Sequence, residues 1–188
     1  MGRWGPDARG RLEHAAMQLY VERGYEQTTV ADIAERAGLT ERTFFRHFAD
    51  KREVLFRGAG DLQALIVAAV LGAPQAATPI EAVTAGLQAA GTVFGAHRER
   101  SRWRQTIIDA NAELQARELS KMAALAAAIT AALHQRGLTG PSAALTANVG
   151  IVVFRTAFAR WVGEDSDHDW PQFIRESLEE LKMAVAGE

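Results

Sequence analysis

The stretch TVADIAERAGLTERTFFRHF, residues 29–48, carries the strongest structural signal of this chain. It contains two short amphipathic segments separated by Gly38. The first begins at Thr29, whose hydroxyl can cap a helix, and Asp32 follows three positions on, where a carboxylate favours the positive end of a helix. The second begins at Thr40, which can act as a cap in the same way. The pattern predicts two short helices joined by a tight turn, because glycine lets the turn backbone take a positive φ.

Two short helices with a glycine-containing turn between them are typical of a DNA-binding helix-turn-helix. On the second predicted helix, Phe44 and Phe48 lie one turn apart on one face, so we expect them to anchor it to the core. On the other face, the guanidinium groups of Arg42 and Arg46 suit guanine edges or phosphates, and the short hydroxyl of Thr43 suits close contact in a groove. An ordinary hairpin with a solvated arginine face is the alternative, which the order of these features disfavours. The opposite face and its flanks carry Arg42, Thr43, Phe45, Arg46 and His47.

This order of residues resembles the tetracycline-repressor (TetR) family. The resemblance covers residues 10–57 and rests on residues 28–40, on residues 43–51 and on Glu53 with the Val and Leu that follow it. It implies an all-helical homodimer, usually a repressor that a ligand releases from DNA. Carried over by position, it implies contacts with bases or backbone by Thr40, Arg42, Thr43, Phe45 and His47, and phosphate contacts by Thr29 and Lys51.

Two positions depart from the family's pattern. Phe45 stands where the family usually has a tyrosine, so a contact from a hydroxyl to a phosphate is missing. Arg46 occupies a position that is often aromatic, and its added cation is expected to shift operator preference. Arg3, Arg9 and Arg11 precede the motif, and two interpretations stay open for them: phosphate or minor-groove contacts, or a solvated tail.

The composition is compatible with a DNA-binding protein and excludes two kinds of cysteine-dependent protein. The chain has 188 residues, of which 48% are hydrophobic and 23% charged, as in ordinary soluble globular proteins. It has no cysteine, which excludes a disulfide framework and a zinc–cysteine site. The formal net charge is −2, but residues 1–57 hold ten Lys and Arg against nine Asp and Glu. Because phosphate binding depends on where the cations lie, a near-neutral total does not exclude DNA.

The chain shows no sign of a membrane or secretion signal. Its longest apolar stretch, residues 62–72, is too short to span a bilayer, and no apolar signal core follows the N-terminus. We therefore expect a cytoplasmic protein without a membrane partner.

Apolar residues follow the helical period almost throughout, which predicts an all-α fold of about nine helices and no strand. We expect residues 1–57 to form a three-helix helix-turn-helix domain and residues 58–188 to form a helical domain for ligand binding and dimerisation. Asp50, with Glu53 three positions on, is the predicted cap of a fourth helix. Gly58 and Gly60 would lie early in that helix, either as a hinge that transmits ligand binding or as sites of close packing.

The second domain has no comparable motif. Its segments 103–133 and 154–161 are similar to actinobacterial members of the family, some of which respond to long-chain acyl-CoA. This similarity implies a pocket for a small apolar ligand, such as an acyl-CoA or a fatty-acid-like molecule. We expect no cofactor. Amphipathic helices can enclose such a cavity, although aromatic residues at helical spacing also form ordinary cores. The candidate lining residues are Phe94, Trp103, Ile107, Asn111, Met122, Asn148, Phe154 and Trp161.

Two charged segments have competing interpretations. Residues 97–104 contain four arginines and are interpreted as a solvated turn near the DNA-binding domain, with capture of a ligand phosphate or carboxylate as the alternative. Residues 164–169 gather carboxylates around His168. The favoured interpretation is a polar loop in which Asp169 caps the last helix, with a metal site as the alternative.

The last two predicted helices carry apolar stripes that favour a dimer. Their apolar residues recur at intervals of three and four, which suits helices packed at shallow angles, and two such hairpins related by a twofold axis make a four-helix bundle. Intramolecular core is the alternative for half of each stripe. The predicted dimer-interface residues are Ile151, Phe154, Phe158, Ile174, Leu178 and Leu181.

An all-helical enzyme is the main rival class. No Ser-His-Asp set, carboxylate pair or metal-ligand spacing can be identified in the sequence, so we expect neither an enzyme nor a metal protein. A second rival is a DNA-binding regulator without a small-molecule ligand, controlled by a protein partner. The sequence leaves this rival open.

Overall fold

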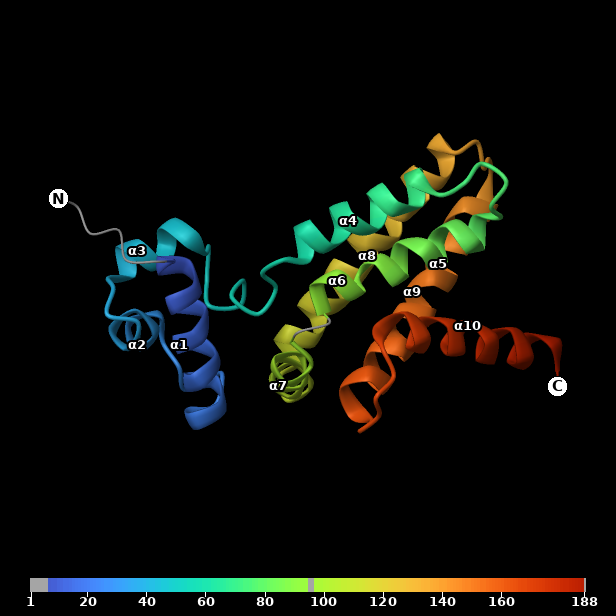
Figure 1. Ribbon diagram of the computed structural model, residues 1–188. Helices are drawn as coiled ribbons and strands as arrows, with labels where there is room; N and C mark the ends of the chain where they lie inside the picture. The colour runs from blue at the N-terminus through green and yellow to red at the C-terminus, as the bar shows by residue number, and fades with distance from the viewer. Residues whose placement is uncertain (1–6, 95–96, 188) are drawn as a thin grey trace. The chain divides into compact units, whose positions relative to one another are not determined.

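The computed structural model describes residues 7–94 and 97–187, and every regular element within these residues is a helix (Figure 1). The predicted all-α fold is confirmed, and the single-turn α6 brings the described helices to ten, against about nine expected. The helices are α1 (Ala8–Arg23), α2 (Val30–Arg36), α3 (Glu41–His47), α4 (Ala59–Gly72), α5 (Pro79–Ala89), α6 (Gly91–Phe94), α7 (Arg98–Asp109), α8 (Ala112–Gln135), α9 (Pro141–Gly163) and α10 (Trp170–Ala186).

The chain divides into two compact units, and the first is not continuous in sequence. It combines the chain up to Arg57 with Trp103–Glu118, while the second combines Gly58–Arg102 with the chain from Leu119 onward. The sequence boundary after residue 57 left Trp103–Glu118 in the second domain. In the structure this segment joins the first unit because three of its apolar side chains are buried in that unit's core: Ile107, Ile108 and Leu114.

Helices α1, α2 and α3 pack around the core of the first unit. Thr29 and Thr40 cap α2 and α3 through their hydroxyls, as the sequence predicts. The caps are local features, but the burial of the apolar faces is what holds short seven-residue helices in place, since isolated helices of this length are not stable in water. All three helices contribute large side chains that are fully buried: Leu12, Leu19, Ile33 and Phe44.

The helix predicted from Asp50 onward is a short turn that does not continue. Asp50 caps it as expected, because its Oδ1 accepts the backbone N–H groups two and three residues on, at 2.9 and 3.1 Å. Residues 51–58 then form turns, and α4 begins only at Ala59. Gly58 has φ 82°, which interrupts a right-handed helix. The prediction holds for Gly60, which lies in the first turn of this fourth helix, but the helix does not start at Asp50 and Gly58 precedes it.

The second unit is a helical bundle of α4, α5, α9 and α10, with the second half of α8 in the same core. Helix α5 packs against α4, α9 and α10. Trp170 Nε1 donates a hydrogen bond to the Leu87 carbonyl oxygen at 2.7 Å, which ties the start of α10 to α5. Arg136, just after α8, donates to the Ala73 and Pro74 carbonyls at 2.7 and 2.8 Å and so closes the end of α4.

Helix α9 has the length and composition of a helix that could span a membrane, with a mean hydropathy of 1.4 in its most apolar window. It is longer and lies later in the chain than the apolar stretch at residues 62–72. Of that window 39% is buried inside the chain, and its buried residues, among them Ala147, Ile151 and Phe154, belong to the core of the second unit. The exposed remainder forms a separate surface, described below.

Gly86 on α5 allows close packing against α4. A Cβ at this position would lie 2.9 Å from the Ile66 carbonyl oxygen and 2.7 Å from Val70 Cγ2. Gly86→Ala should lower the free energy of unfolding by about 1–3 kcal/mol through overpacking, although alanine is about 1 kcal/mol better than glycine in a helix. Gly60→Ala is the matched control, since a Cβ there meets no atom within 4 Å. Urea denaturation of both variants measures the difference, and a Gly86→Ala protein as stable as the control would contradict the close approach.

Candidate nucleic-acid interface

Helix α3 presents one apolar and one polar face. Phe44 is fully buried, Phe48 is 4% exposed, and their ring centroids lie 5.4 Å apart. These two residues anchor α3 to the core, as their spacing predicts. On the opposite side, Arg42 and Arg46 are exposed and make no hydrogen bond or ion pair within residues 7–94 and 97–187. Two guanidinium groups with all their donors available therefore lie side by side on the outer face of α3.

Two of the three threonines expected to touch DNA, Thr29 and Thr40, are the exposed caps of α2 and α3. The Thr40 hydroxyl accepts the Thr43 N–H at 3.2 Å, and the two hydroxyl oxygens are 3.1 Å apart. Thr29 and Asp32 form a reciprocal capping box. Asp32 Oδ2 accepts the Thr29 hydroxyl at 2.6 Å and the Thr29 N–H at 2.8 Å, and these hydrogen bonds hold the pKa of Asp32 below its usual value. The caps set where both helices begin and hence which α3 residues face outward.

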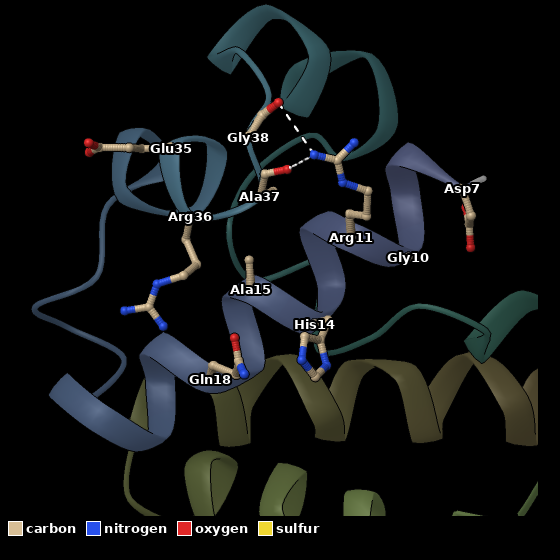
Figure 2. A pocket seen from close by; sticks show the side chains of 10 residues that line it. All are labelled: Asp7, Gly10, Arg11, His14, Ala15, Gln18, Glu35, Arg36, Ala37 and Gly38. Carbon is tan, nitrogen blue, oxygen red and sulfur yellow. Dashed lines mark hydrogen bonds between the residues drawn. The ribbon is translucent and has the colours of Figure 1, made fainter. Parts of the chain in front are cut away.

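The turn between α2 and α3 is held by α1. Gly38 has φ 63°, as predicted for a tight turn. Figure 2 shows the Arg11 side chain extending from α1 to this turn, where its guanidinium donates to the carbonyl oxygens of Ala37 and Gly38. Arg11 is thus a positioning residue for α3, a role that the sequence analysis missed. An open hollow of about 590 Å³ lies beside it, lined by Asp7, Gly10, Arg11, His14, Ala15, Gln18, Glu35, Arg36, Ala37 and Gly38.

The other arginines of the N-terminal arm are accounted for only in part. Arg9 pairs with Glu13 at 3.6 Å, and its guanidinium lies 5.6 Å from the centroid of the Phe48 ring. Arg3 lies outside the described residues. For Arg9 and Arg11, the contacts within the first unit replace the picture of a solvated tail.

Of three further DNA-contact candidates, Lys51 and His47 are half-buried and Phe45 is exposed. Lys51 Nζ donates to the carbonyl oxygens of Tyr25 at 2.8 Å and Thr28 at 3.0 Å, and it lies 4.3 Å from the Tyr25 ring centroid. Lys51 therefore closes the loop between α1 and α2, and a phosphate contact requires it to exchange one of these hydrogen bonds. His47 Nε2 is buried without a hydrogen-bond partner among the described residues. Phe45, in contrast, is 55% exposed.

The turn of residues 50–57 is fixed by Trp103–Glu118, the discontinuous segment of the first unit. Arg104 stacks on the Phe56 ring, with 5.1 Å between the guanidinium carbon and the ring centroid. Burial lowers the pKa of Arg104. These contacts join residues far apart in the sequence, so no local pattern indicated them. Three arginines donate hydrogen bonds between the turn and this segment: Arg52 to Glu113, Arg117 to Glu53, and Arg104 to the Leu55 carbonyl oxygen.

In the second unit, two arginines of segment 97–104 cap the carboxyl end of α9. Arg102 Nε donates to the Val162 carbonyl oxygen at 2.6 Å, and the last carbonyls of a helix lack partners within it and favour cations. The interpretation of this segment as a solvated turn is wrong for these residues. A polar hollow of about 510 Å³ lies beside them. The Arg98 guanidinium donates to the carbonyl oxygens of Trp161, Glu164 and Ser166.

The acidic loop before α10 acts as a cap. The Asp169 side chain accepts the Gln172 N–H at 2.9 Å, which confirms the predicted start of the last helix. His168 lies 3.4 Å from Glu176. Over the part of the chain that the structure describes, no group of three or more His, Cys, Asp or Glu side chains is placed to hold a metal ion.

Half of the pocket candidates come together in the second unit. Phe154 and Trp161 lie in the core of that unit, and Phe94 and Met122 pack against it, partly buried. The aromatic side chains among them form a cluster with two further rings. Its neighbouring ring centroids lie between 4.8 and 6.4 Å apart, which is the range of packed aromatic pairs. We name it the aromatic cluster; its members are Phe94, Phe154, Phe158, Trp161 and Trp170.

The remaining pocket candidates lie elsewhere. Ile107 is buried in the core of the first unit, and Asn111 Nδ2 donates to the Ile107 carbonyl oxygen at 2.7 Å. Trp103 belongs to the same unit and is 49% exposed. Asn148 is exposed and bonds the Ala144 carbonyl oxygen of its own helix at 2.8 Å. The aromatic spacing alone could not separate the residues of the two units, because α7 and α8 each contribute to both.

The predicted dimer residues are mostly core of the second unit. Ile151, Phe154, Ile174 and Leu178 are at most 9% exposed, and Phe158 and Leu181 are partly buried against the same core. The stripe therefore follows the intramolecular alternative. A second stripe on α9 is exposed instead, with Leu145 66% and Val152 54% accessible. We name it the α9 stripe; it consists of Leu145, Val149, Val152, Thr156 and Ala159, all exposed and spaced by four and three residues.

Comparison with known proteins gives matches over both units. Residues 13–57 match the family model of bacterial regulatory proteins of the tetR family, and residues 77–186 match the MftR C-terminal domain. The regulator TcmR of Streptomyces glaucescens is 37% identical over 81 residues, which are 43% of this chain and 36% of TcmR. The repressor KstR2 of Mycobacterium tuberculosis is 43% identical over 47 residues, which are 25% of this chain and 24% of KstR2. The matched stretches thus cover about a third or less of these relatives.

Solved structures share the fold over nearly the whole chain. FadR of Bacillus subtilis, a transcriptional regulator solved in complex with stearoyl-CoA, matches with a TM-score of 0.61 at 19% identity, over 92% of this chain and 96% of FadR. At this identity the likeness concerns the fold. Together, the helix-turn-helix geometry and the two family models show that this chain belongs to the TetR family of bacterial regulatory proteins.

Proposed function

We propose that this chain is a homodimeric transcriptional repressor that binds a palindromic operator and releases it when a small apolar molecule binds the second unit. The observation that carries the DNA-binding part is the outer face of α3. There Arg42 and Arg46 are exposed and have no partner among the described residues, while Phe44 and Phe48 hold the helix by its other side. A helix held in this way can enter the major groove and present two guanidinium groups to guanine edges or phosphates.

Arg42→Ala should weaken binding to the preferred operator by about 1–3 kcal/mol and relax base specificity, because it removes a candidate base contact.

Lys51→Ala should weaken binding to all sequences alike and lower the salt slope by about one if Lys51 reaches a phosphate. Since Lys51 also holds the Tyr25 and Thr28 carbonyls, this variant should be less stable as well. Equilibrium binding to operator and random DNA over a range of salt concentrations measures both effects.

Arg175→Ala is the control for the loss of a positive charge, because Arg175 is an exposed arginine on α10 of the second unit. It should bind operator as the wild type does. Wild-type protein without salt-sensitive binding to any selected DNA would contradict the proposed function.

The dimer is proposed to form through the α9 stripe. Its residues are spaced as in helices packed at shallow angles, they are apolar or small, and they remain exposed after the second unit has folded. A twofold pair of such helices presents two copies of α3. An operator bound by both copies has half-sites one helical turn apart, about 34–36 Å, or a multiple of that distance.

The ligand part of the proposal rests on the aromatic cluster and on fold similarity. FadR of Bacillus subtilis, in complex with stearoyl-CoA, has the same fold. We infer an acyl-CoA or fatty-acid-like ligand at the cluster. Because its rings are already packed against one another, binding must displace some of them. Regulation by a protein partner without any ligand is the second candidate, and the same tight packing favours it.

Stearoyl-CoA should lower operator affinity and change the tryptophan fluorescence of the protein. Trp161 and Trp170, two of the four tryptophans, belong to the cluster and would change environment when an acyl chain enters. Operator titrations with and without stearoyl-CoA measure the first effect, and native mass spectrometry identifies any ligand that co-purifies. Coenzyme A without an acyl chain is the control. Unchanged operator affinity and fluorescence, with no co-purified ligand, would favour the protein-partner alternative.

A further inference from the structure

Phe45 is a large apolar side chain on the face of α3 that otherwise carries charge. It is 55% exposed, and its ring is held edge-on against the buried Phe44, with centroids 5.5 Å apart and planes at 85°. The neighbouring Arg42 and Arg46 are exposed cations. A phenyl ring fixed against a core residue and flanked by two available guanidinium groups is a preorganised apolar contact point within a polar surface.

The chemistry of the phenyl ring narrows what it can recognise. Phe45 has neither a donor nor an acceptor, so it cannot hydrogen-bond to a phosphate or to a base edge. In the major groove, the base pairs present donors, acceptors and one apolar group, the C5-methyl of thymine, and phenylalanine is among the side chains that contact it. We propose that Phe45 recognises a thymine methyl group in the operator, so that one T·A pair in each half-site is selected by apolar contact. This inference rests on the proposed function, because it requires α3 to lie in the major groove.

The position of Phe45 on the helix places this thymine relative to the other contacts. Arg42 and Phe45 are three residues apart, so their Cβ atoms are neighbours at about 5–6 Å on the helix surface. Successive bases on one strand are about 3.4 Å apart along the axis. The thymine should therefore lie within two base pairs of the base that Arg42 contacts.

Replacement of single thymines by deoxyuridine tests the proposal, since it removes only the methyl group and keeps the base pair. The duplex used is the one selected from random DNA by the wild-type protein. Burial of one methyl group is worth about fourfold in affinity. Wild-type affinity should therefore fall about fourfold at one thymine of a half-site, and about fifteenfold when both half-sites are changed.

Phe45→Ala should bind the thymine operator more weakly than wild type and bind the thymine and uracil duplexes equally. Phe45→Leu keeps an apolar side chain and should keep part of the uracil sensitivity. Because Phe45 is exposed, both variants should keep the wild-type circular dichroism and melting temperature. A second pair of duplexes carries a C·G pair at this position, with either cytosine or 5-methylcytosine. The added methyl group should raise the affinity of the wild type and leave the affinity of Phe45→Ala unchanged.

Two results would overturn the assignment: no thymine at which uracil lowers wild-type affinity, or the same uracil sensitivity in Phe45→Ala. These results leave the proposed function intact, because wild-type protein still binds the thymine operator in a salt-dependent way. Absence of any salt-sensitive DNA binding overturns the proposed function and this assignment together.

Discussion

Val152→Glu should convert the protein from a dimer to a monomer and lower its operator affinity by about 10²–10⁴-fold, the gain that linked binding of two half-sites provides. Val152 lies in the middle of the α9 stripe and is 54% exposed, so the glutamate is solvated in the monomer and leaves the core untouched. In a twofold interface each substitution occurs twice, and two buried carboxylates would face each other. Sedimentation at micromolar concentration measures the state of assembly, and operator titration measures the affinity.

Two other substitutions separate the loss of the dimer from the loss of the fold. Ala127→Glu adds the same charge to an exposed position on α8 and should change neither assembly nor binding. Leu178→Glu, at a predicted dimer residue that is only 9% exposed in the structure, should unfold the second unit, because it places a carboxylate in the core. A dimeric Val152→Glu protein, or a monomeric wild type, would contradict the assignment of the interface to the α9 stripe.

Phe44→Ala should lower the free energy of unfolding of the first unit by about 3–5 kcal/mol, the cost of removing a buried phenylalanine. Phe44 is fully buried and contacts the rings of both Phe45 and Phe48. Small domains have only about 5–15 kcal/mol of stability, so a large part of the first unit's stability is lost and operator binding should fail near physiological temperature. Denaturant unfolding and hydrogen exchange of the α1–α3 amides measure the change.

Phe45→Ala is the matched control, because it removes the same ring from the next position, where it is 55% exposed. Its free energy of unfolding should stay within about 0.5 kcal/mol of wild type, as for surface substitutions in general. Equal destabilisation by the two substitutions would mean that the burial pattern of α3 is not the one described.

Much of the first unit could be predicted from the sequence because its determinants are local. The caps at Thr29 and Thr40 act on amides within three residues, as does the Asp169 cap in the second unit, and the faces of α3 follow from the helical period. The positive φ of Gly38 is likewise a property of a turn only a few residues long. These local features are sufficient to identify the candidate DNA-contacting face of α3.

Where local rules competed with each other, the prediction failed. Asp50 does cap a turn, yet the helix expected to follow is interrupted, because Gly58 takes a left-handed conformation that sequence periodicity does not report. The same limit applies to α9, where two apolar stripes share one helix and periodicity could not tell which of them faces the core. The residues expected at the dimer surface, such as Phe154, are instead core.

Local sequence is enough to show that the chain is helical, where several of its helices begin and which face of α3 carries cations, since each depends on residues within one or two turns. Three other features follow from tertiary contacts alone: Arg11 holds the turn before α3, Lys51 is bound to loop carbonyls, and Trp103–Glu118 belongs to the first unit. Tertiary contacts also select which stripe of α9 stays exposed. These outcomes depend on burial and on hydrogen bonds between residues more than 20 positions apart, and hydrophobic burial is non-directional, so a local pattern shows that a side chain is apolar without showing what covers it.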